Sequence, residues 1–178
     1  MKNKDIYIDD AGWGFPLCGV FFGIYYDSDQ RFDFAEVPVA FFQSPLFERK
    51  AYLTEAADRV SDILNQANCL PSSSGQIHIC PGYVNNRIAY ALAQQGFSVC
   101  REPIGEPLQT KLEEMYKKHI QKITGQNFYY DPKLFTKKEV AHKFFRVVNW
   151  IKANNRFDIA KTGWKYFKKR NQQRRLYG

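Results

Sequence analysis

The sequence predicts an α/β fold, in which a mixed five-stranded sheet (three antiparallel strands, then parallel strands) carries helices on both faces. Three observations support this. Residues 1–42 contain three short apolar runs separated by turns rich in Gly or Asp. From residue 46 onward, patterns of helical period alternate with short strand patterns, which is typical of parallel crossovers. Hydrophobic residues make up 44% of the 178 residues, which is enough for a substantial core.

The antiparallel part of the sheet is predicted from residues 5–9, 20–26 and 32–42. The turn "GWGFPLCG" separates the first two strands, and "DSDQ" separates the second from the third. The run "VFFGIYY" is apolar and aromatic throughout, so it predicts a buried strand. Pro38 predicts an edge or a bulge in the third strand, because proline has no N–H for a strand ladder. The close turns favour an antiparallel meander.

The later part of the chain alternates between helix and strand. In its first helix, Leu53, Val60 and Leu64 recur at helical spacing. Gly96 and Gly125 are expected to end two later helices, because glycine readily adopts the left-handed conformation found there. The predicted elements are a helix over 46–67, a strand over 76–80, a helix over 85–95, a strand over 97–103, and helices over 107–124 and 136–153.

Apolar runs and cysteines indicate which cellular compartment the chain suits. No run of 18 apolar residues is present, so we expect no membrane span. Acidic residues follow the first basic ones at once, unlike a secretory signal peptide. The four cysteines have no CxxC spacing, which favours free thiols in a reducing, cytoplasmic compartment over a zinc site or disulfides. They are Cys18, Cys69, Cys80 and Cys100.

Charge divides the chain into two parts. From Lys133 to the end there are 14 basic and 2 acidic residues, whereas residues 1–132 contain 12 basic and 16 acidic residues. A basic segment attached to an acidic part indicates a polyanionic partner such as RNA or DNA. We therefore expect a globular domain over residues 1–125 and a basic, aromatic-rich helical extension over residues 126–178. The sequence does not indicate an oligomeric state.

The stretch "IYIDDAGWG", residues 6–14, is the most specific local pattern. It joins a short apolar strand to two adjacent acids, Asp9 and Asp10, and then to a Gly-Trp-Gly turn. Carboxylates at a strand end are suitable ligands for Mg²⁺ or Mn²⁺, which prefer hard oxygen donors. Acids beside glycine are also common in simple turns. The pattern alone leaves a metal site and a solvated turn open.

The order of the predicted elements is similar to that of the ribonuclease H-like superfamily over roughly residues 5–124. The stretch "IDDAGWGFPLCG" also resembles the first-strand motif of type 2 ribonucleases H, which runs Ile-Asp-Glu-Ala-Gly-Arg-Gly before a Pro/Leu-Ala-Gly stretch. Asp10 stands where that family has Glu, and Trp13 stands where it has Arg. The matching positions are Asp9, Ala11, Gly12 and Gly14.

The resemblance implies a ribonuclease H-like fold and a metal-dependent nuclease. In such enzymes, two divalent ions roughly 3.5–4 Å apart activate water and neutralise charge on the phosphate. The family commonly has an acid at the end of the fourth strand, but here that strand ends in "HICPGYVNN", with Asn85 and Asn86 as the nearest polar candidates. Glu102 and Glu106 lie at the end of the fifth strand and the start of the next helix, at the same carboxyl edge of the predicted sheet as Asp9. We therefore expect Asp9, Asp10 and Glu102 to hold Mg²⁺ or Mn²⁺, with Glu106 as a further catalytic residue. Both glutamates also suit a helix N-terminus without any catalytic role.

The C-terminal stretch "KTGWKYFKKRNQQRRLYG" contains seven basic residues and no acids, with aromatic residues between them. Basic side chains neutralise phosphates, and aromatic rings stack on unpaired bases. Solvated lysines over docked aromatics would give the same pattern. The helix before it is expected to bury Phe144, Phe145, Val148 and Trp150. The residues expected to contact nucleic acid are Gly12, Trp13, Gly14, Lys161, Trp164, Lys165, Lys168, Lys169, Arg170, Arg174 and Arg175.

The sequence thus favours a divalent-metal-dependent nuclease acting on RNA, a hybrid or structured DNA. The alternative is a non-catalytic nucleic-acid-binding module on the same scaffold, which the acid missing from the fourth strand favours. A weaker third hypothesis is a protein-interaction domain whose tail docks on an acidic partner. A membrane-surface role is disfavoured by the acidic remainder of the chain.

Overall fold

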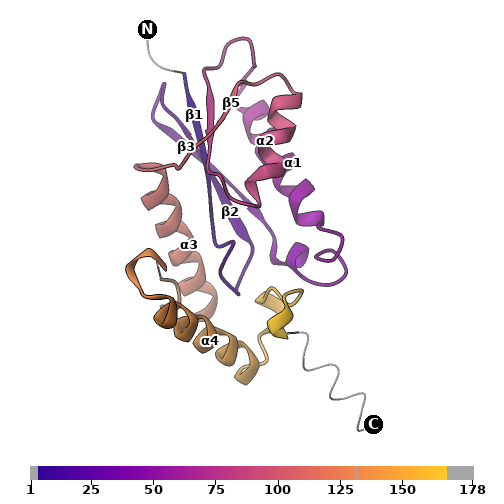
Figure 1. The fold of residues 1–178 in the computed structure, drawn as a ribbon, viewed down its shortest axis with the longest axis vertical. Coiled ribbons are helices and arrows are strands. Elements are labelled where there is room, and N and C mark those ends of the chain that lie inside the picture. The colour runs from indigo at the N-terminus through magenta and orange to yellow at the C-terminus, as the bar shows by residue number, and fades with distance from the viewer. Residues whose placement is uncertain (1–3, 131, 168–178) are drawn as a thin grey trace.

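A computed structural model describes residues 4–130 and 132–167. Its centre is a five-stranded sheet of order β3-β2-β1-β4-β5 (Figure 1). β1 pairs antiparallel with β2, and β2 pairs antiparallel with β3, whereas β1, β4 and β5 run parallel. The predicted mixed five-stranded sheet is therefore confirmed. The strands are β1 (Ile6–Ala11), β2 (Val20–Tyr26), β3 (Arg31–Val37), β4 (Ile77–Ile79) and β5 (Val99–Arg101).

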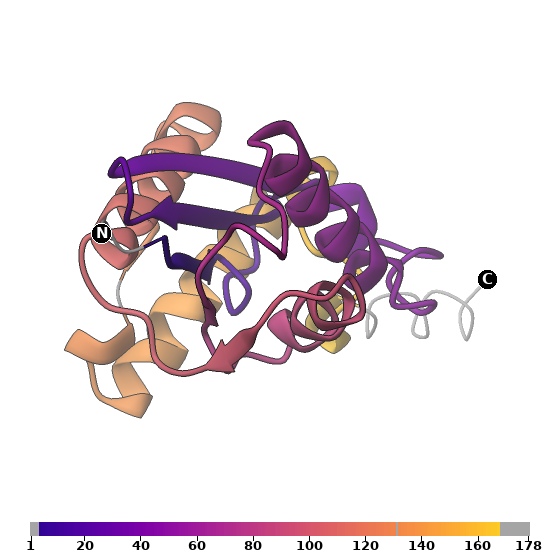
Figure 2. The ribbon, with the colours of Figure 1, turned by 90° about the horizontal axis from the view of Figure 1, so that it is seen from above.

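Helices cover the two faces of the sheet in separate layers. α1 and α2 pack on one face, and α3 crosses the opposite face over β1 and β2 (Figures 1 and 2). α4 lies beyond the lower end of the sheet in Figure 1, beside α3. The helices are α1 (Ala51–Gln66), α2 (Asn85–Gln94), α3 (Leu108–Thr124) and α4 (Lys137–Ala153), with 3₁₀ turns at Val39–Phe42, Pro132–Leu134 and Phe157–Ile159.

The alternation of side chains along β1 determines where its two acids point. Ile6 and Ile8 belong to the core beneath α1 and α2, whereas Ala11 belongs to the core beneath α3. Because neighbouring strand residues face opposite sides of a sheet, Asp9 lies on the α3 face and Asp10 on the α1/α2 face. Asp9 pairs with Gly23 of β2, and the side chains of α3 fill the space that this glycine leaves.

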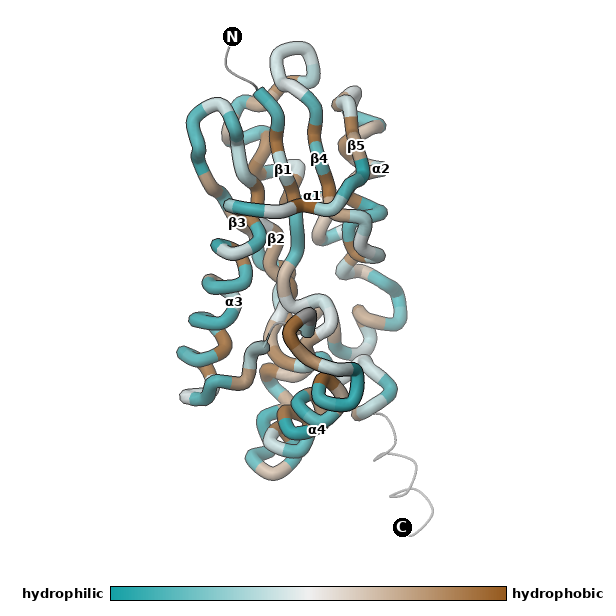
Figure 3. The backbone as a smooth tube through the Cα atoms, turned by 60° about the vertical axis from the view of Figure 1, so that its left-hand side comes forward, coloured by the Kyte–Doolittle hydropathy of each residue, from teal (hydrophilic) through white to brown (hydrophobic). Residues whose placement is uncertain are grey.

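The α3-side core joins the sheet to the C-terminal part of the chain. Val147 and Ile151 of α4 are buried in the same cluster as Leu17 and Tyr116. The Tyr116 hydroxyl donates hydrogen bonds to the carbonyls of Leu17 (2.7 Å) and Gly19 (3.3 Å), so it fixes the turn after β1. Figure 3 shows apolar and hydrophilic positions alternating along α3 and α4, as amphipathic helices require.

Several element boundaries differ from those predicted. β1 continues to Ala11 because β2 pairs with it along its full length. The third strand ends at Val37, and a 3₁₀ turn follows directly after Pro38. α1 begins at Ala51, five residues later than predicted, because residues 46–50 form turns. Val148 is buried as expected, but Phe145 is 47% exposed.

Within residues 4–130 and 132–167, we find no helix that combines the length and the apolar character needed to cross a membrane.

Candidate functional site

An open cavity of about 440 Å³ lies at the end of β1. Acidic residues from two elements line it: Asp9 and Asp10 come from β1, and Glu113 comes from α3. Cys80, which directly follows β4, also lines the cavity. The parallel pairing of β1 with β4 places Cys80 here, since its N–H donates to the carbonyl of Ile8 (3.1 Å). Residues from three elements, each carrying a polar or ionisable group, thus line one opening.

Asp9 is held by its immediate surroundings. Its side chain is only 8% exposed, and its Oδ1 accepts a hydrogen bond from the backbone N–H of Asp10 (2.8 Å). The Cys80 thiol faces the same carboxylate. Burial, together with the nearby charge of Asp9, raises the pKa of Cys80 to about 12. Cys80 is therefore a protonated thiol at neutral pH and donates toward Asp9 rather than acting as a nucleophile.

Asp10 points to the other face and is tied to the start of α2. Its Oδ1 accepts a hydrogen bond from Nδ2 of the fully buried Asn85 (3.0 Å). Burial and the charge of Asp9 raise the pKa of Asp10 to about 7, although Asn85 and Lys161 act in the opposite direction. A carboxyl group with such a pKa gains or loses its proton near neutral pH. Perturbed carboxyl groups of this kind are typical of functional sites.

Lys161 brings a basic side chain to this site. It is fully buried, and its ammonium group donates a hydrogen bond to the carbonyl of Gly12. Its Nζ lies 5.0 Å from the ring centroid of Phe42 and 5.4 Å from that of Trp164. Burial lowers the pKa of Lys161 to about 7, although Asp10 favours the charged form. Lys161 was expected to contact nucleic acid, but its burial places it inside the protein instead.

The buried Lys161 predicts an unusual dependence of stability on pH. Between pH 7 and 9, an unfolded chain keeps the lysine proton, because the ordinary pKa is 10.5, whereas the folded chain loses it. Stability rises with pH wherever the unfolded state binds more protons. We therefore expect the free energy of unfolding of the wild type to rise by about 2 kcal/mol from pH 7 to 9 relative to that of Lys161→Met. Urea unfolding followed by circular dichroism measures both.

Lys165→Met is the matched control, because Lys165 is exposed and next to the same turn. It should keep the pH dependence of the wild type and change stability by no more than about 0.5 kcal/mol. Identical pH dependence in the wild type and in Lys161→Met would contradict the assignment of a depressed pKa to Lys161.

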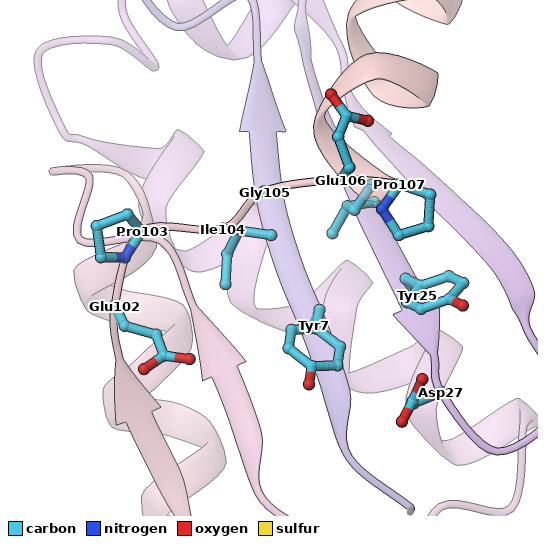
Figure 4. A pocket seen from close by; sticks show the side chains of 10 residues that line it. Tyr7, Tyr25, Asp27, Glu102, Pro103, Ile104, Gly105, Glu106 and Pro107 are labelled. Carbon is cyan, nitrogen blue, oxygen red and sulfur yellow. The ribbon is translucent and has the colours of Figure 1, made fainter.

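The predicted ligands Glu102 and Glu106 lie elsewhere. Figure 4 shows them at opposite ends of the loop that crosses the sheet from β5 to α3, around a second cavity lined by Tyr7, Tyr25 and Asp27. Among the described residues, the two cavities share no lining residue. The structure therefore brings together Asp9 and Asp10, but it does not bring either glutamate to them.

Glu113 is the acid that the sequence reasoning missed. The buried stripe of α3 consists of Leu108, Leu112, Tyr116 and Ile120, spaced four residues apart. Gln109 and Glu113 each follow a member of this stripe by one residue and are hydrogen-bonded to one another (3.3 Å). Their place beside the apolar stripe was the local signal that the sequence carried for them.

An aromatic groove continues from the carboxylate cavity. Its volume is about 540 Å³, and Trp13, Gly14 and Tyr130 line both spaces. The groove is formed mainly by α4 and the segment after it, and Lys137 also lines it. Of the predicted nucleic-acid contacts, Trp13, Gly14 and Trp164 line this groove. Lys168, Lys169, Arg170, Arg174 and Arg175 lie outside the described residues.

Comparison with known proteins finds no family model that matches the chain and no curated protein with significant sequence similarity.

Proposed function

We propose that this chain is a divalent-metal-dependent nuclease of the ribonuclease H-like type, which hydrolyses phosphodiester bonds in nucleic acid at the carboxylate cavity. One observation carries the proposal: Asp9, Asp10 and Glu113 line a single open cavity at the end of the central strand of a mixed five-stranded sheet. The acids at the end of β1 agree with the resemblance of "IDDAGWG" to the first-strand motif of type 2 ribonucleases H.

The donor set suits Mg²⁺ or Mn²⁺, because these ions prefer a few carboxylates and water over nitrogen or sulfur ligands. The raised pKa of Asp10 indicates that its charge is opposed by burial and by the charge of Asp9. A bound divalent cation would relieve that opposition, activate water near neutral pH and neutralise charge on the phosphate. Asn85 holds one carboxyl oxygen of Asp10, Oδ1, toward the start of α2 through its hydrogen bond, so the orientation of Asp10 is set before any cation binds.

The aromatic groove favours a substrate with unpaired bases. Phe144 packs against Trp164 and Tyr166, with ring centroids 6.2 and 5.0 Å apart. Phe145 and Tyr166 are 47% and 39% exposed, so ring faces remain accessible. Aromatic faces bind bases of any sequence by stacking, while lysines beside them neutralise phosphates. The groove opens into the carboxylate cavity, so a strand lying in it would lead toward the acids.

The test is cleavage by the full chain. Labelled single-stranded RNA, duplex DNA, an RNA–DNA hybrid and branched DNA are incubated with Mg²⁺ or Mn²⁺, and parallel samples contain EDTA. We expect metal-dependent cleavage of at least one substrate and none with EDTA. Binding without cleavage of any substrate under these conditions would reject the nuclease proposal.

A second candidate is a non-catalytic nucleic-acid-binding module, and the buried ammonium group of Lys161 favours it. That group already supplies positive charge next to Asp10. Cys80 also stands at the end of β4, where the resemblance implies an acid. In this case, the acids and Lys161 would stabilise the turn after β1, and the groove alone would bind the strand. Binding that weakens steeply with salt, without cleavage, would identify this candidate.

The groove predicts the effect of removing one exposed ring. Phe145→Ala should weaken binding of a fluorescein-labelled single-stranded oligonucleotide about 5- to 150-fold, because stacking on one base contributes ~1–3 kcal/mol. Fluorescence anisotropy titration measures the Kd. Phe34→Ala is the matched control, since Phe34 is 50% exposed on β3 and lies outside the groove. Equal weakening by both variants would argue against base stacking in the groove.

A further inference from the structure

A second group of ligand-type side chains lies on the parallel edge of the sheet. His78 of β4 pairs with Cys100 of β5, so both side chains project from the same face. Glu102 follows β5 directly, and its Oε1 lies 2.7 Å from His78 Nδ1. The Cys100 thiol lies 3.8 Å from the other oxygen, Oε2. The three potential ligand atoms all lie within 4.8 Å of one another.

His78 is oriented as a metal-binding histidine would be. Its Nε2 is buried and makes no hydrogen bond among the described residues, although Asp5 Oδ2 is 3.5 Å away. Asp5 is itself positioned, because its other oxygen, Oδ1, accepts a hydrogen bond from the N–H of Gln76 (2.8 Å). Tyr7 stacks on the imidazole ring, with centroids 4.7 Å apart. A carboxylate behind one ring nitrogen, with the other nitrogen facing ligand atoms, is the usual arrangement around a zinc-bound histidine.

We propose that His78, Cys100 and Glu102 bind a zinc ion. A tetrahedral site with bonds of about 2.0–2.3 Å needs ligand atoms roughly 3.3–3.8 Å apart. The present spacings of 2.7 and 3.8 Å require only small side-chain shifts. The Cys100 thiol would lose its proton to solvent and bind as a thiolate, and Asp5 would accept the Nε2–H of His78. This proposal does not depend on the nuclease proposal.

The ligand types select zinc over the hard ions considered for the carboxylate cavity. Thiolate and imidazole ligands suit Zn²⁺, whereas Mg²⁺ and Mn²⁺ prefer oxygen donors. Within the part of the chain that the structure describes, the cluster has three protein ligands, so a fourth position is left for water or another small ligand. Glu102 also lines the cavity of about 220 Å³ beneath the loop from β5 to α3 (Figure 4). The fourth position is therefore next to a space that a small molecule can enter, as in zinc sites that are not purely structural.

The test is metal binding to the full chain after treatment with EDTA and removal of the chelator. Titration with Co²⁺ should give a thiolate-to-cobalt absorption band in the near ultraviolet, whose intensity corresponds to one thiolate-bound cobalt ion per chain. Competition with a chromophoric chelator then gives the Kd for Zn²⁺. Cys100→Ser should abolish the band, and Glu102→Gln and Asp5→Asn should each weaken Zn²⁺ binding by about 10- to 100-fold or more. Glu102 is 46% exposed, so its variant is not expected to disturb folding.

Two controls locate the ion. Cys69→Ser changes a partly buried thiol outside the cluster and should leave the cobalt band intact. Asp9→Asn should also leave it intact, because Asp9 lies in the other cavity. An absent band in the wild type at saturating Co²⁺, or a band that persists in Cys100→Ser, would overturn the zinc proposal. Neither outcome bears on cleavage, so the two proposals fail separately.

Discussion

Asp9→Asn is expected to reduce metal-dependent cleavage by on the order of 10³-fold, because loss of one charged ligand removes several kcal/mol of stabilisation from the transition state. The substitution keeps the size of the side chain and the oxygen that accepts the N–H of Asp10. It removes the negative charge that a divalent cation needs and that raises the pKa of Asp10. Initial rates of cleavage at saturating Mg²⁺ or Mn²⁺ measure the effect.

Glu113→Gln should act in the same direction, because Glu113 lines the same cavity from α3. Glu106→Gln is the matched control: it makes the same change of carboxylate to amide in the other cavity, and the amide oxygen can still accept the hydrogen bond of Thr110. It should keep the wild-type rate. Loss of activity in Glu106→Gln, with full activity in Glu113→Gln, would contradict the proposal, because it would place the reaction in the cavity that Glu106 lines.

Gly12→Ala is expected to lower the free energy of unfolding by about 2–5 kcal/mol. Gly12 has φ +91°, which side chains rarely adopt, and an added Cβ would lie 2.3 Å from the ring of Tyr116. Overpacking costs about 1–3 kcal/mol, and the left-handed backbone adds about 1–2 kcal/mol. Tyr116 cannot move freely, because it is fully buried and hydrogen-bonded to Leu17. Urea unfolding of the variant and the wild type measures the difference.

Gly14→Ala is the control for this prediction. Gly14 belongs to the same turn, but an added Cβ there meets no atom within 4 Å, so the change should stay within about 0.5 kcal/mol. A double-mutant cycle adds a second check: in a Tyr116→Leu background, Gly12→Ala should cost less than in the wild type. Equal costs in both backgrounds would show that the clash with Tyr116 is not the cause. The carbonyl of Gly12 also accepts the hydrogen bond of Lys161. Gly12→Ala should therefore also shift the position of the Lys161 side chain relative to Asp10.

Local sequence patterns were sufficient for most of the secondary structure. Apolar runs and turn residues located β1, β2 and the parallel strands, and helical spacing located α1 to α4. Where boundaries differed, pairing or local turns were the cause: β2 extended β1 to Ala11, and turns over residues 46–50 delayed the start of α1. The pattern of acids after an apolar run also placed Asp9 and Asp10 correctly at the end of the central strand, since that placement needs only local information.

The sequence did not predict which acidic side chains lie near Asp9 and Asp10. Glu102 and Glu106 were expected beside Asp9, because parallel strands end at one edge of a sheet. The loop after β5 instead carries them around a separate cavity, and the rotation of α3 brings Glu113 to the acids. The orientation of a helix about its axis depends on its packing against the whole sheet. The apolar stripe of α3 restricts this orientation but does not determine it.

The sequence by itself determined the α/β class, the order of elements and the paired acids of β1, because propensity, period and turn chemistry act between near neighbours. Only the tertiary structure decided the partners of those acids. Lys161 lies 149 residues from Gly12 in the chain, and His78 meets Glu102 only because β4 and β5 pair in one register. The sequence shows which side chains are ionisable, but the fold decides whether such a side chain is next to water or next to another buried group.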